Sequence, residues 1–283
     1  MSGAAARTPP PGPGEVRAAA AGARDGTLLV ALDFDGVLAP LVDDPATSRA
    51  LPASARALER LAAAGAPVAL VSGRALRDLW TVAAPPPGVH LVGGHGAEHG
   101  RATADGLVTE PFALPPDDAR TLAELTADLE ALIEGTTARV ERKPASAVLH
   151  TRTVDPDDAR RLAAAAAALG NDAGVDVLAG KDVVELSVLH VSKGEALRAL
   201  RARLGVTRVL FAGDDVTDER AFALLEPQDL TVKVGPGPTA ARLRVADPAA
   251  VATLLTDIAA LVTGATSSAR AGKGADAGTT AGS

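Results

Sequence analysis

The sequence contains no cysteine, which excludes a disulfide framework, a thiolate metal site and a cysteine nucleophile. Aromatic residues make up only 2% of the chain, and Trp80 is its single tryptophan. Cores must therefore be filled by small and branched side chains, and aromatic platforms for stacking sugars are scarce. The lack of cysteine agrees with a reducing compartment, and we expect a cytoplasmic protein.

Clustered positive charge is also missing. The formal net charge is -7, whereas proteins that bind nucleic acid carry groups of Lys and Arg against the phosphate backbone. No apolar run reaches the roughly 18 residues that span a bilayer, and the chain does not open with a signal-peptide pattern. We therefore expect a soluble monomer with a small-molecule ligand that binds neither nucleic acid nor membrane.

The chain does show a regular alternation of two patterns. With 47% apolar residues it can form sizeable buried cores. Short apolar runs that end in turn residues are typical of buried parallel strands; they cover residues 28–33, 68–73, 89–94, 209–214 and 230–234. Amphipathic stretches with helical spacing lie between them. This alternation predicts an α/β fold with a mostly parallel, Rossmann-like sheet.

The middle of the chain has a different pattern, with two long helical stretches that are each followed by strand-like segments. This pattern predicts a smaller α+β domain inserted into the core. Both ends are rich in Ala and Gly without periodicity, which predicts mobile tails. The expected boundaries are tails at residues 1–26 and 264–283, a core at 27–112 and 188–263, and an inserted domain at 113–187.

Two groups of carboxylates follow apolar strands. Asp33 and Asp35 come where the first strand ends, the edge at which parallel sheets border a ligand crevice. One carboxylate can attack phosphorus while the other protonates the leaving oxygen and activates water; an Asp-rich turn is the alternative. The repulsion among Asp214, Asp215 and Asp218 has a rationale if Mg²⁺ binds there, with Asp214 as a ligand and the other two beside it. Helix capping would explain part of this cluster.

A hydroxyl and a lysine complete the candidate site. Ser72 and Gly73 follow another strand, where a hydroxyl beside free N–H groups can hold an anion; a helix N-cap is the alternative for Ser72. Ser192 and Glu195 have the spacing of a capping box, which predicts a helix with Lys193 in its first turn. A cation there opposes the helix macrodipole unless a phosphoryl group or carboxylate offsets it; a solvated surface lysine is the alternative. Together these groups predict phosphoryl transfer.

In their order along the chain, DFDGV, SGR, Lys193 and GDDVTD resemble the four motifs of the haloacid dehalogenase superfamily of phosphohydrolases. The resemblance implies that Asp33 is a nucleophile that forms an aspartyl-phosphate and that Asp35 is the general acid and base. It also implies that Mg²⁺ binds the side chains of Asp33 and Asp214 and the backbone carbonyl of Asp35. Ser72 and Lys193 would bind the phosphoryl group, and the inserted domain would be a cap that closes over the substrate.

Within that superfamily the chain resembles the trehalose 6-phosphate phosphatases over nearly all of residues 28–225. The resemblance rests on DFDGVLAPLVDDP, VSGR, GGHGAE, ERKPASAVLHTR, KDVVEL, SKG and GDDVTDERAF. It implies substrate contacts from Arg74, Gly94, His95, Gly96, Glu141, Lys143, Lys181 and Glu185. Polar positions on the solvent face of a strand are the alternative reading of the strand residues in this set. The chain departs from the family at Val37, where many relatives carry Thr, and at Ser187-Val188, where a basic residue and proline are usual.

We therefore expect a Mg²⁺-dependent phosphatase that hydrolyses trehalose 6-phosphate to trehalose and phosphate, the last step of trehalose biosynthesis. One alternative is a related phosphatase that acts on sucrose 6-phosphate or a glucosylglycerate phosphate. A second is a phospho-accepting signalling domain, and a third is a catalytically silent partner of a synthase. The second carboxylate, Asp35, argues against signalling, because a switch benefits from a long-lived phosphoaspartate.

Overall fold

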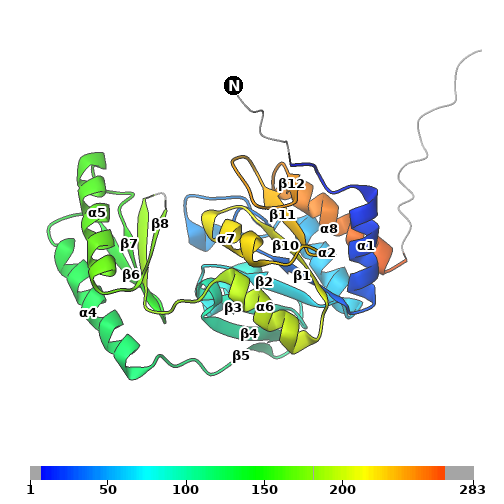
Figure 1. The fold of residues 1–283 in the computed structure, drawn as a ribbon, viewed down its shortest axis with the longest axis horizontal. Coiled ribbons are helices and arrows are strands. Elements are labelled where there is room, and N and C mark those ends of the chain that lie inside the picture. Colours follow the sequence, from blue (N-terminus) through cyan, green and yellow to red (C-terminus); the bar gives the residue numbers. More distant parts are fainter. Residues whose placement is uncertain (1–7, 181, 265–283) are drawn as a thin grey trace, which may run out of the picture.

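The computed structural model describes residues 8–180 and 182–264. Figure 1 shows two sheets, each with its own helices, joined by two connecting segments. The larger unit, which we call the core, contains α1 (Pro13–Arg24), β1 (Leu28–Leu32), η1 (Pro45–Thr47), α2 (Pro52–Ala63), β2 (Val68–Val71), α3 (Leu76–Ala83), β3 (His90–Gly93), η2 (Gly94–Gly96), β4 (Glu98–Thr103), β5 (Gly106–Thr109), α6 (Lys193–Leu204), β10 (Arg208–Gly213), α7 (Val216–Leu224), β11 (Leu230–Val234), β12 (Leu243–Val245) and α8 (Pro248–Val262).

The core sheet has eight strands in the order β12-β11-β10-β1-β2-β3-β4-β5. Strands β12 to β3 are parallel, while β4 and β5 are added antiparallel at the β3 edge. The expected α/β fold with a parallel-sheet core is confirmed. The sequence analysis did not identify β4, β5 or β12.

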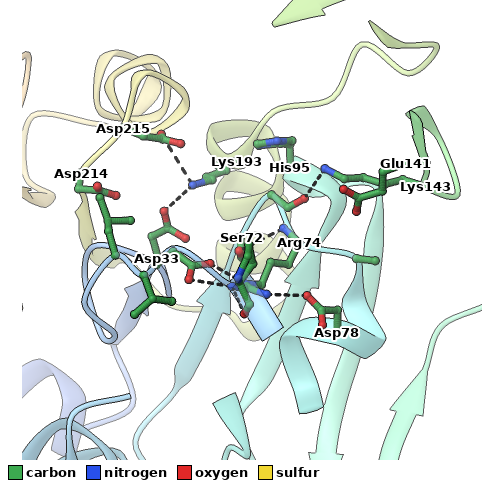
Figure 2. Close-up of a pocket in the computed structure, with 16 residues that line it drawn as sticks. Asp33, Ser72, Arg74, Asp78, His95, Glu141, Lys143, Lys193, Asp214 and Asp215 are labelled. Atoms are coloured by element: carbon green, nitrogen blue, oxygen red, sulfur yellow. Dashed lines mark hydrogen bonds and ion pairs between the residues drawn. The ribbon is translucent and has the colours of Figure 1, made fainter. Parts of the chain in front are cut away.

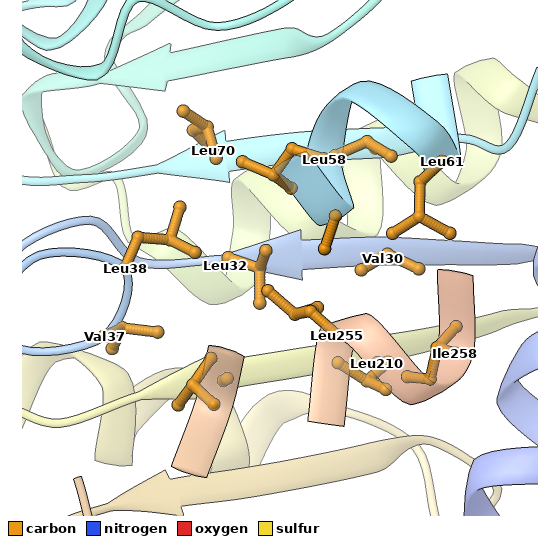
Figure 3. Packing of buried hydrophobic residues seen from close by; sticks show 14 of the residues in the cluster. Val30, Leu32, Val37, Leu38, Leu58, Leu61, Leu70, Leu210, Leu255 and Ile258 are labelled. Carbon is orange, nitrogen blue, oxygen red and sulfur yellow. The ribbon is translucent and has the colours of Figure 1, made fainter. Parts of the chain in front are cut away.

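Alternate residues of each central strand face opposite helical layers. In β1, Leu28, Val30 and Leu32 pack toward α1, α2, α3 and α8, whereas Leu29 and Ala31 pack toward α6 and α7. Figure 3 shows the first of these layers between β1, α2 and α8. Burying a side chain such as Leu or Val in this way contributes about 1.5–3 kcal/mol, and the cluster fixes the strand ends from which the site is built.

The expectation of a mobile tail up to residue 26 is wrong for residues 13–24, which form helix α1. The Ala and Gly composition resembles that of a linker, but Ala19, Ala20 and Ala23 are buried because α1 packs against α8 and β1. Small side chains let the two helices approach closely. The other expected tail, residues 264–283, lies outside the described residues from position 265 onward.

The smaller unit lies between β5 and α6, and we call it the inserted domain. It contains α4 (Pro116–Leu132), β6 (Arg139–Arg142), β7 (Ser146–His150), α5 (Pro156–Asp172), β8 (Asp176–Gly180) and β9 (Val183–Ser187). Its antiparallel sheet has the order β6-β7-β9-β8. Helices α4 and α5 cover one face through a cluster that includes Leu125, Leu129, Leu149 and Leu186. Figure 1 shows that the uncovered face is directed toward the core.

Within residues 8–180 and 182–264, none of the helices combines the length and the apolar character that crossing a bilayer requires.

Candidate active site

The candidate site lies where several parallel strands of the core end. Asp33 follows β1, Ser72 follows β2 and Asp214 follows β10, while Lys193 is the first residue of α6. Because neighbouring parallel strands end at the same edge of a sheet, these side chains converge on one cavity of about 500 Å³. The inserted domain contributes to the same cavity, as Figure 2 shows for Glu141 and Lys143.

Lys193 lies at the centre of a buried ionic cluster. Its Nζ donates to Asp33 Oδ2 and to Asp218 Oδ1, both at 2.8 Å, and its side chain is 1% exposed. Burial alone would lower the pKa of Lys193, but the charges of Asp218 and Asp33 outweigh it and raise that pKa well above its usual value. The expected helix start is confirmed, because Ser192 caps α6 by accepting a hydrogen bond from the Glu195 N–H. The alternative of a solvated surface lysine is wrong.

The carboxylates around Lys193 are crowded. Burial raises the pKa of Asp33 well above its usual value, and burial together with Asp218 and Asp215 raises the pKa of Asp214 to about 7. Oxygens of Asp33, Asp214 and Asp218 lie within 4.8 Å of one another. Clustered carboxylates of this kind are stabilised in their charged form by a hard divalent cation, so the donor set fits Mg²⁺.

Both carboxylate oxygens of Asp218 already accept hydrogen bonds within that cluster. Its Oδ1 accepts from Lys193, and its Oδ2 accepts from the backbone N–H groups of Asp214 and Asp215. Asp215 in turn caps α7 by accepting from the Asp218 N–H, which confirms the capping interpretation for this residue. Asp33 also accepts at both oxygens, from Lys193 and from the Phe34 N–H. Asp33 and Asp214 line the cavity, however, whereas Asp218 is fully buried and orients the loop that carries Asp214.

Gly36 allows the DFDG turn to approach Asp214. Its φ is +76°, and a Cβ at this position would lie 2.2 Å from Asp214 Oδ2. A side chain would therefore be strained by the backbone and would collide with the carboxylate. The glycine keeps the two acidic loops in contact.

Ser72 is not a helix cap, so that alternative is wrong. Helix α3 begins at Leu76 with Ala75 as its N-cap, whereas Ser72 Oγ accepts from the Arg74 N–H at 3.2 Å. Ser72 is 3% exposed and lines the cavity together with Gly73. Its hydroxyl is thus placed for a ligand oxygen on the side opposite Asp214 in Figure 2.

A second ionic cluster joins the inserted domain to the core. Lys143 Nζ donates to Glu185 Oε2 and to the carbonyl oxygen of Gly73, both at 3.0 Å. Ser146 Oγ donates to Glu185 Oε1 at 2.6 Å, and His95 Nε2 lies 3.4 Å from Glu185 Oε2. Burial opposes ionisation of Glu185, but the hydrogen bond with His95 and the charge of Lys143 lower its pKa to about 2.

The turn that carries His95 is conformationally demanding. His95 has a φ of 56°, which a non-glycine residue seldom adopts, between Gly94 at 54° and Gly96 at 128°. A Cβ on Gly73 would lie 2.4 Å from the His95 ring, so the imidazole can lie across that residue only because it is glycine. The strain directs His95 toward Glu185.

Three more residues were expected to contact the substrate: Glu141, Arg74 and Lys181. Glu141 Oε2 accepts from His150 Nε2 at 2.8 Å, and this hydrogen bond lowers the pKa of Glu141, which also lines the cavity. Arg74 also lines the cavity, but its guanidinium is bound to Asp35 and Asp78. Lys181 lies outside the described residues.

Sequence reasoning missed two residues that contact the site. Ser48 is fully buried and its Oγ donates to Asp35 Oδ1 at 2.8 Å. Lys233 is 5% exposed, and its Nζ donates to the carbonyl oxygen of Asp214 and lies 3.6 Å from Glu219 Oε1. A lysine inside the apolar run 230–234 signals a buried cation that needs partners. Ser48 has no comparable signal, because its contact depends on the path of the loop after β1.

Comparisons with known proteins agree with this geometry. Residues 31–249 match the family model described as trehalose-phosphatase. The chain is 37% identical over 211 residues to an uncharacterized glycosyl hydrolase of Mycobacterium tuberculosis, covering 68% of this chain and 15% of that protein. It is 32% identical over 234 residues to a trehalose-phosphate phosphatase of Mycobacterium marinum, covering 79% of this chain and 59% of that protein. The chain thus spans a minor part of the first relative and somewhat over half of the second.

The fold also matches a solved structure. The C-terminal domain of trehalose-6-phosphate phosphatase from C. albicans superposes with a TM-score of 0.73 at 23% identity. The match covers 90% of this chain and 99% of that domain. At this identity the likeness concerns the fold alone.

Proposed function

Because the chain belongs to the trehalose-phosphatase family, we propose that it hydrolyses trehalose 6-phosphate to trehalose and phosphate through an aspartyl-phosphate on Asp33. The observation that carries this proposal is the position of the Asp33 carboxylate. It lies at the edge of a cavity between Lys193 and Asp214, and residues of the inserted domain line the same cavity.

The reaction we propose has two steps that use the same two carboxylates. Asp33 attacks phosphorus, the bond from phosphorus to the sugar oxygen breaks, and a proton passes from the Asp35 carboxyl group to that oxygen. Asp35, now a carboxylate, takes a proton from water as the water oxygen attacks phosphorus. The bond from phosphorus to Asp33 then breaks, and inorganic phosphate leaves.

Lys193 and Ser72 would hold the phosphoryl group during both steps. Lys193 Nζ already binds Asp33 Oδ2, so its positive charge lies beside the oxygen atoms that gain negative charge in the transition state. The side chains of Asp33 and Asp214 would hold Mg²⁺, together with the backbone carbonyl of Asp35 expected from the superfamily resemblance. When bound, the ion would supply charge stabilisation for the phosphoryl oxygens.

The inserted domain would recognise the sugar. Glu141, Lys143 and Glu185 lie on or beside the sheet face directed at the core, and the first two line the cavity. Carboxylate and ammonium groups can exchange their mutual hydrogen bonds for bonds to sugar hydroxyls, so that each charged group keeps a hydrogen-bond partner. The scarcity of aromatic residues agrees with recognition by polar groups. Closure of this domain over the substrate would exclude water from the reacting phosphorus.

The test is inorganic phosphate release with Mg²⁺ from trehalose 6-phosphate, beside glucose 6-phosphate, sucrose 6-phosphate and an aryl phosphate. We expect a strong preference for trehalose 6-phosphate that disappears with EDTA and in Asp33→Asn. If the protein released phosphate only from other sugar phosphates, the proposed phosphatase activity would stand and the proposed substrate would be wrong. If the folded protein, supplied with Mg²⁺, releases phosphate from none of these esters, the result would favour the signalling or silent-partner alternatives.

A further inference from the structure

Arg74 is bound almost entirely by the protein itself. Its Nε donates to Asp35 Oδ2 at 2.5 Å and its Nη2 donates to Asp35 Oδ1 at 2.9 Å, which makes a two-point contact with one carboxylate. Nη1 donates to Asp78 Oδ2 at 2.7 Å, and Nη2 also donates to the carbonyl oxygen of Pro45 at 2.9 Å. The Phe34 ring lies 5.8 Å from the guanidinium carbon, close enough for a cation–π contact.

Ser48 adds a third side-chain hydrogen bond to Asp35. Its Oγ donates to Asp35 Oδ1 at 2.8 Å, and the serine is 0% exposed. The Asp35 side chain keeps 30% of its surface exposed and lines the cavity. Three side-chain hydrogen bonds therefore fix the direction of the carboxylate. Two of them go to Oδ1 and one to Oδ2, so Oδ2 keeps the second lone pair that can carry the proton Asp35 transfers.

We propose that Arg74 and Ser48 are positioning residues that orient Asp35 for proton transfer to the leaving sugar oxygen, and that Arg74 does not bind the substrate. This inference rests on the proposed phosphatase function and on the role of Asp35 in it. The sequence resemblance implies a substrate contact for Arg74, and the pattern of hydrogen bonds gives it a different role.

The geometry favours positioning for two reasons. A guanidinium has five N–H donors in a rigid fork, and four donor contacts of Arg74 already go to two carboxylates and a carbonyl. Its side chain is only 11% exposed. One N–H of Nη1 is left over, so a two-point contact with a phosphoryl group would require breaking the ion pair with Asp35, whereas Lys193 already lies beside Asp33 for that task.

Oriented proton donors matter most when the leaving group is a poor one. A sugar alkoxide needs a proton as the bond to phosphorus breaks, whereas a para-nitrophenolate leaves as a stable anion. The ratio kcat/KM reports only the steps up to the first irreversible one, which here is loss of the alcohol or phenol and formation of the aspartyl-phosphate. Comparing the two substrates by kcat/KM therefore isolates the proton that Asp35 delivers.

The experiment measures kcat/KM of Arg74→Ala and Ser48→Ala on trehalose 6-phosphate and on para-nitrophenyl phosphate. We expect Arg74→Ala to lower the value for the sugar phosphate about 100-fold and the value for the aryl ester less than about fivefold. Ser48→Ala, which removes one hydrogen bond and little volume, should give the same selective loss at about fivefold. Arg74→Lys should recover little, because an ammonium cannot reproduce the fork.

Arg77→Ala is the matched control, since Arg77 is an exposed arginine in the first turn of helix α3, three residues after Arg74. It should leave both kcat/KM values within about twofold. Equal losses on both substrates in Arg74→Ala and Ser48→Ala would overturn the inference and assign Arg74 to phosphoryl binding or to folding. Higher activity of Arg74→Ala on the sugar phosphate would also overturn it, because Arg74 would then restrain Asp35. Wild-type turnover of trehalose 6-phosphate tests the proposed function separately from these ratios.

Discussion

The two ionic clusters of the site are built from similar groups but in different places. In one, Lys193 binds Asp33 and Asp218 within the core, at 2.8 Å each and with a 1% exposed side chain. In the other, Lys143 of the inserted domain binds Glu185 and the Gly73 carbonyl at 3.0 Å each, with an 11% exposed side chain. The proposed phosphoryl end of the site thus consists of core residues, while the proposed sugar end depends on how the inserted domain meets the core.

Loss of the core lysine should have the largest effect. Lys193→Met leaves Asp33 and Asp218 buried without their cation, which should lower the free energy of unfolding by roughly 3–5 kcal/mol. It should also lower kcat/KM about 1,000-fold on both sugar and aryl phosphates. Urea denaturation and steady-state kinetics measure the two effects.

Lys143→Met is the matched variant in the second cluster. We expect it to lower the free energy of unfolding by about 1–2 kcal/mol, because Glu185 keeps Ser146 and His95 as partners. The kcat/KM for the aryl phosphate should stay unchanged. Equal stability losses in the two variants would remove the distinction between a preassembled core cluster and a contact between domains.

Divalent metal should act on the core cluster. Removal of metal with EDTA should lower activity on all esters at least about 100-fold, and Mg²⁺ should restore it. Mg²⁺ should also raise the Tm of the wild type, since it relieves repulsion among Asp33, Asp214 and Asp218. Asp214→Asn should raise the Mg²⁺ concentration needed for half-maximal effect in both assays. A Tm shift of the same size in wild type and Asp214→Asn would place the ion elsewhere.

The sequence allowed the core of the site to be predicted better than its surroundings. Strand ends are recognisable from apolar runs, and parallel strands bring their ends together, so Asp33, Ser72 and Asp214 could be identified from them. Lys193 was identified from the capping-box spacing of Ser192 and Glu195 instead. Ser48 was missed because its contact with Asp35 depends on how a loop returns to the sheet, which leaves no local pattern.

The errors arose where tertiary packing overrides local signals. Helix α1 was expected to be mobile, although Pro13 at its first position and Arg24 in its last turn are typical helix-end residues. The helix-cap alternative for Ser72 arose because a hydroxyl between a strand and a helix often caps, but the helix begins four residues later, with Ala75 as its N-cap. The substrate contact that the resemblance implies for Arg74 stays a prediction, and its partners Asp35 and Asp78 are known only from the folded arrangement.

A smaller effect is expected at the sugar end. Glu185→Gln removes the negative charge that pairs with Lys143 and His95 but keeps the size of the side chain. We expect the KM for trehalose 6-phosphate to rise about tenfold, which corresponds to about 1.4 kcal/mol of binding, with little change for para-nitrophenyl phosphate. A comparable rise for the aryl ester would show that Glu185 acts on the phosphoryl end instead. Glu130→Gln, which alters an exposed ion pair of the same domain, is the control.

The smallest effect is expected for the exposed contact between the domains. Arg152 Nη1 donates to the carbonyl oxygen of Asp43 at 3.0 Å, and its side chain is 57% exposed. Arg152→Ala should change the free energy of unfolding by less than about 1 kcal/mol and kcat/KM by less than about threefold. A larger loss, confined to the sugar phosphate, would show that the exposed link governs how the inserted domain meets the core.

Trapping the covalent intermediate tests the central claim most directly. The wild type is mixed with trehalose 6-phosphate and Mg²⁺, quenched in acid within the first turnover and mapped by peptide mass spectrometry, with Asp33→Asn treated in parallel. We expect one added phosphoryl group on the peptide that contains Asp33, and none in Asp33→Asn. Phosphate release by the wild type with no labelled peptide, or a label that persists in Asp33→Asn, would contradict it.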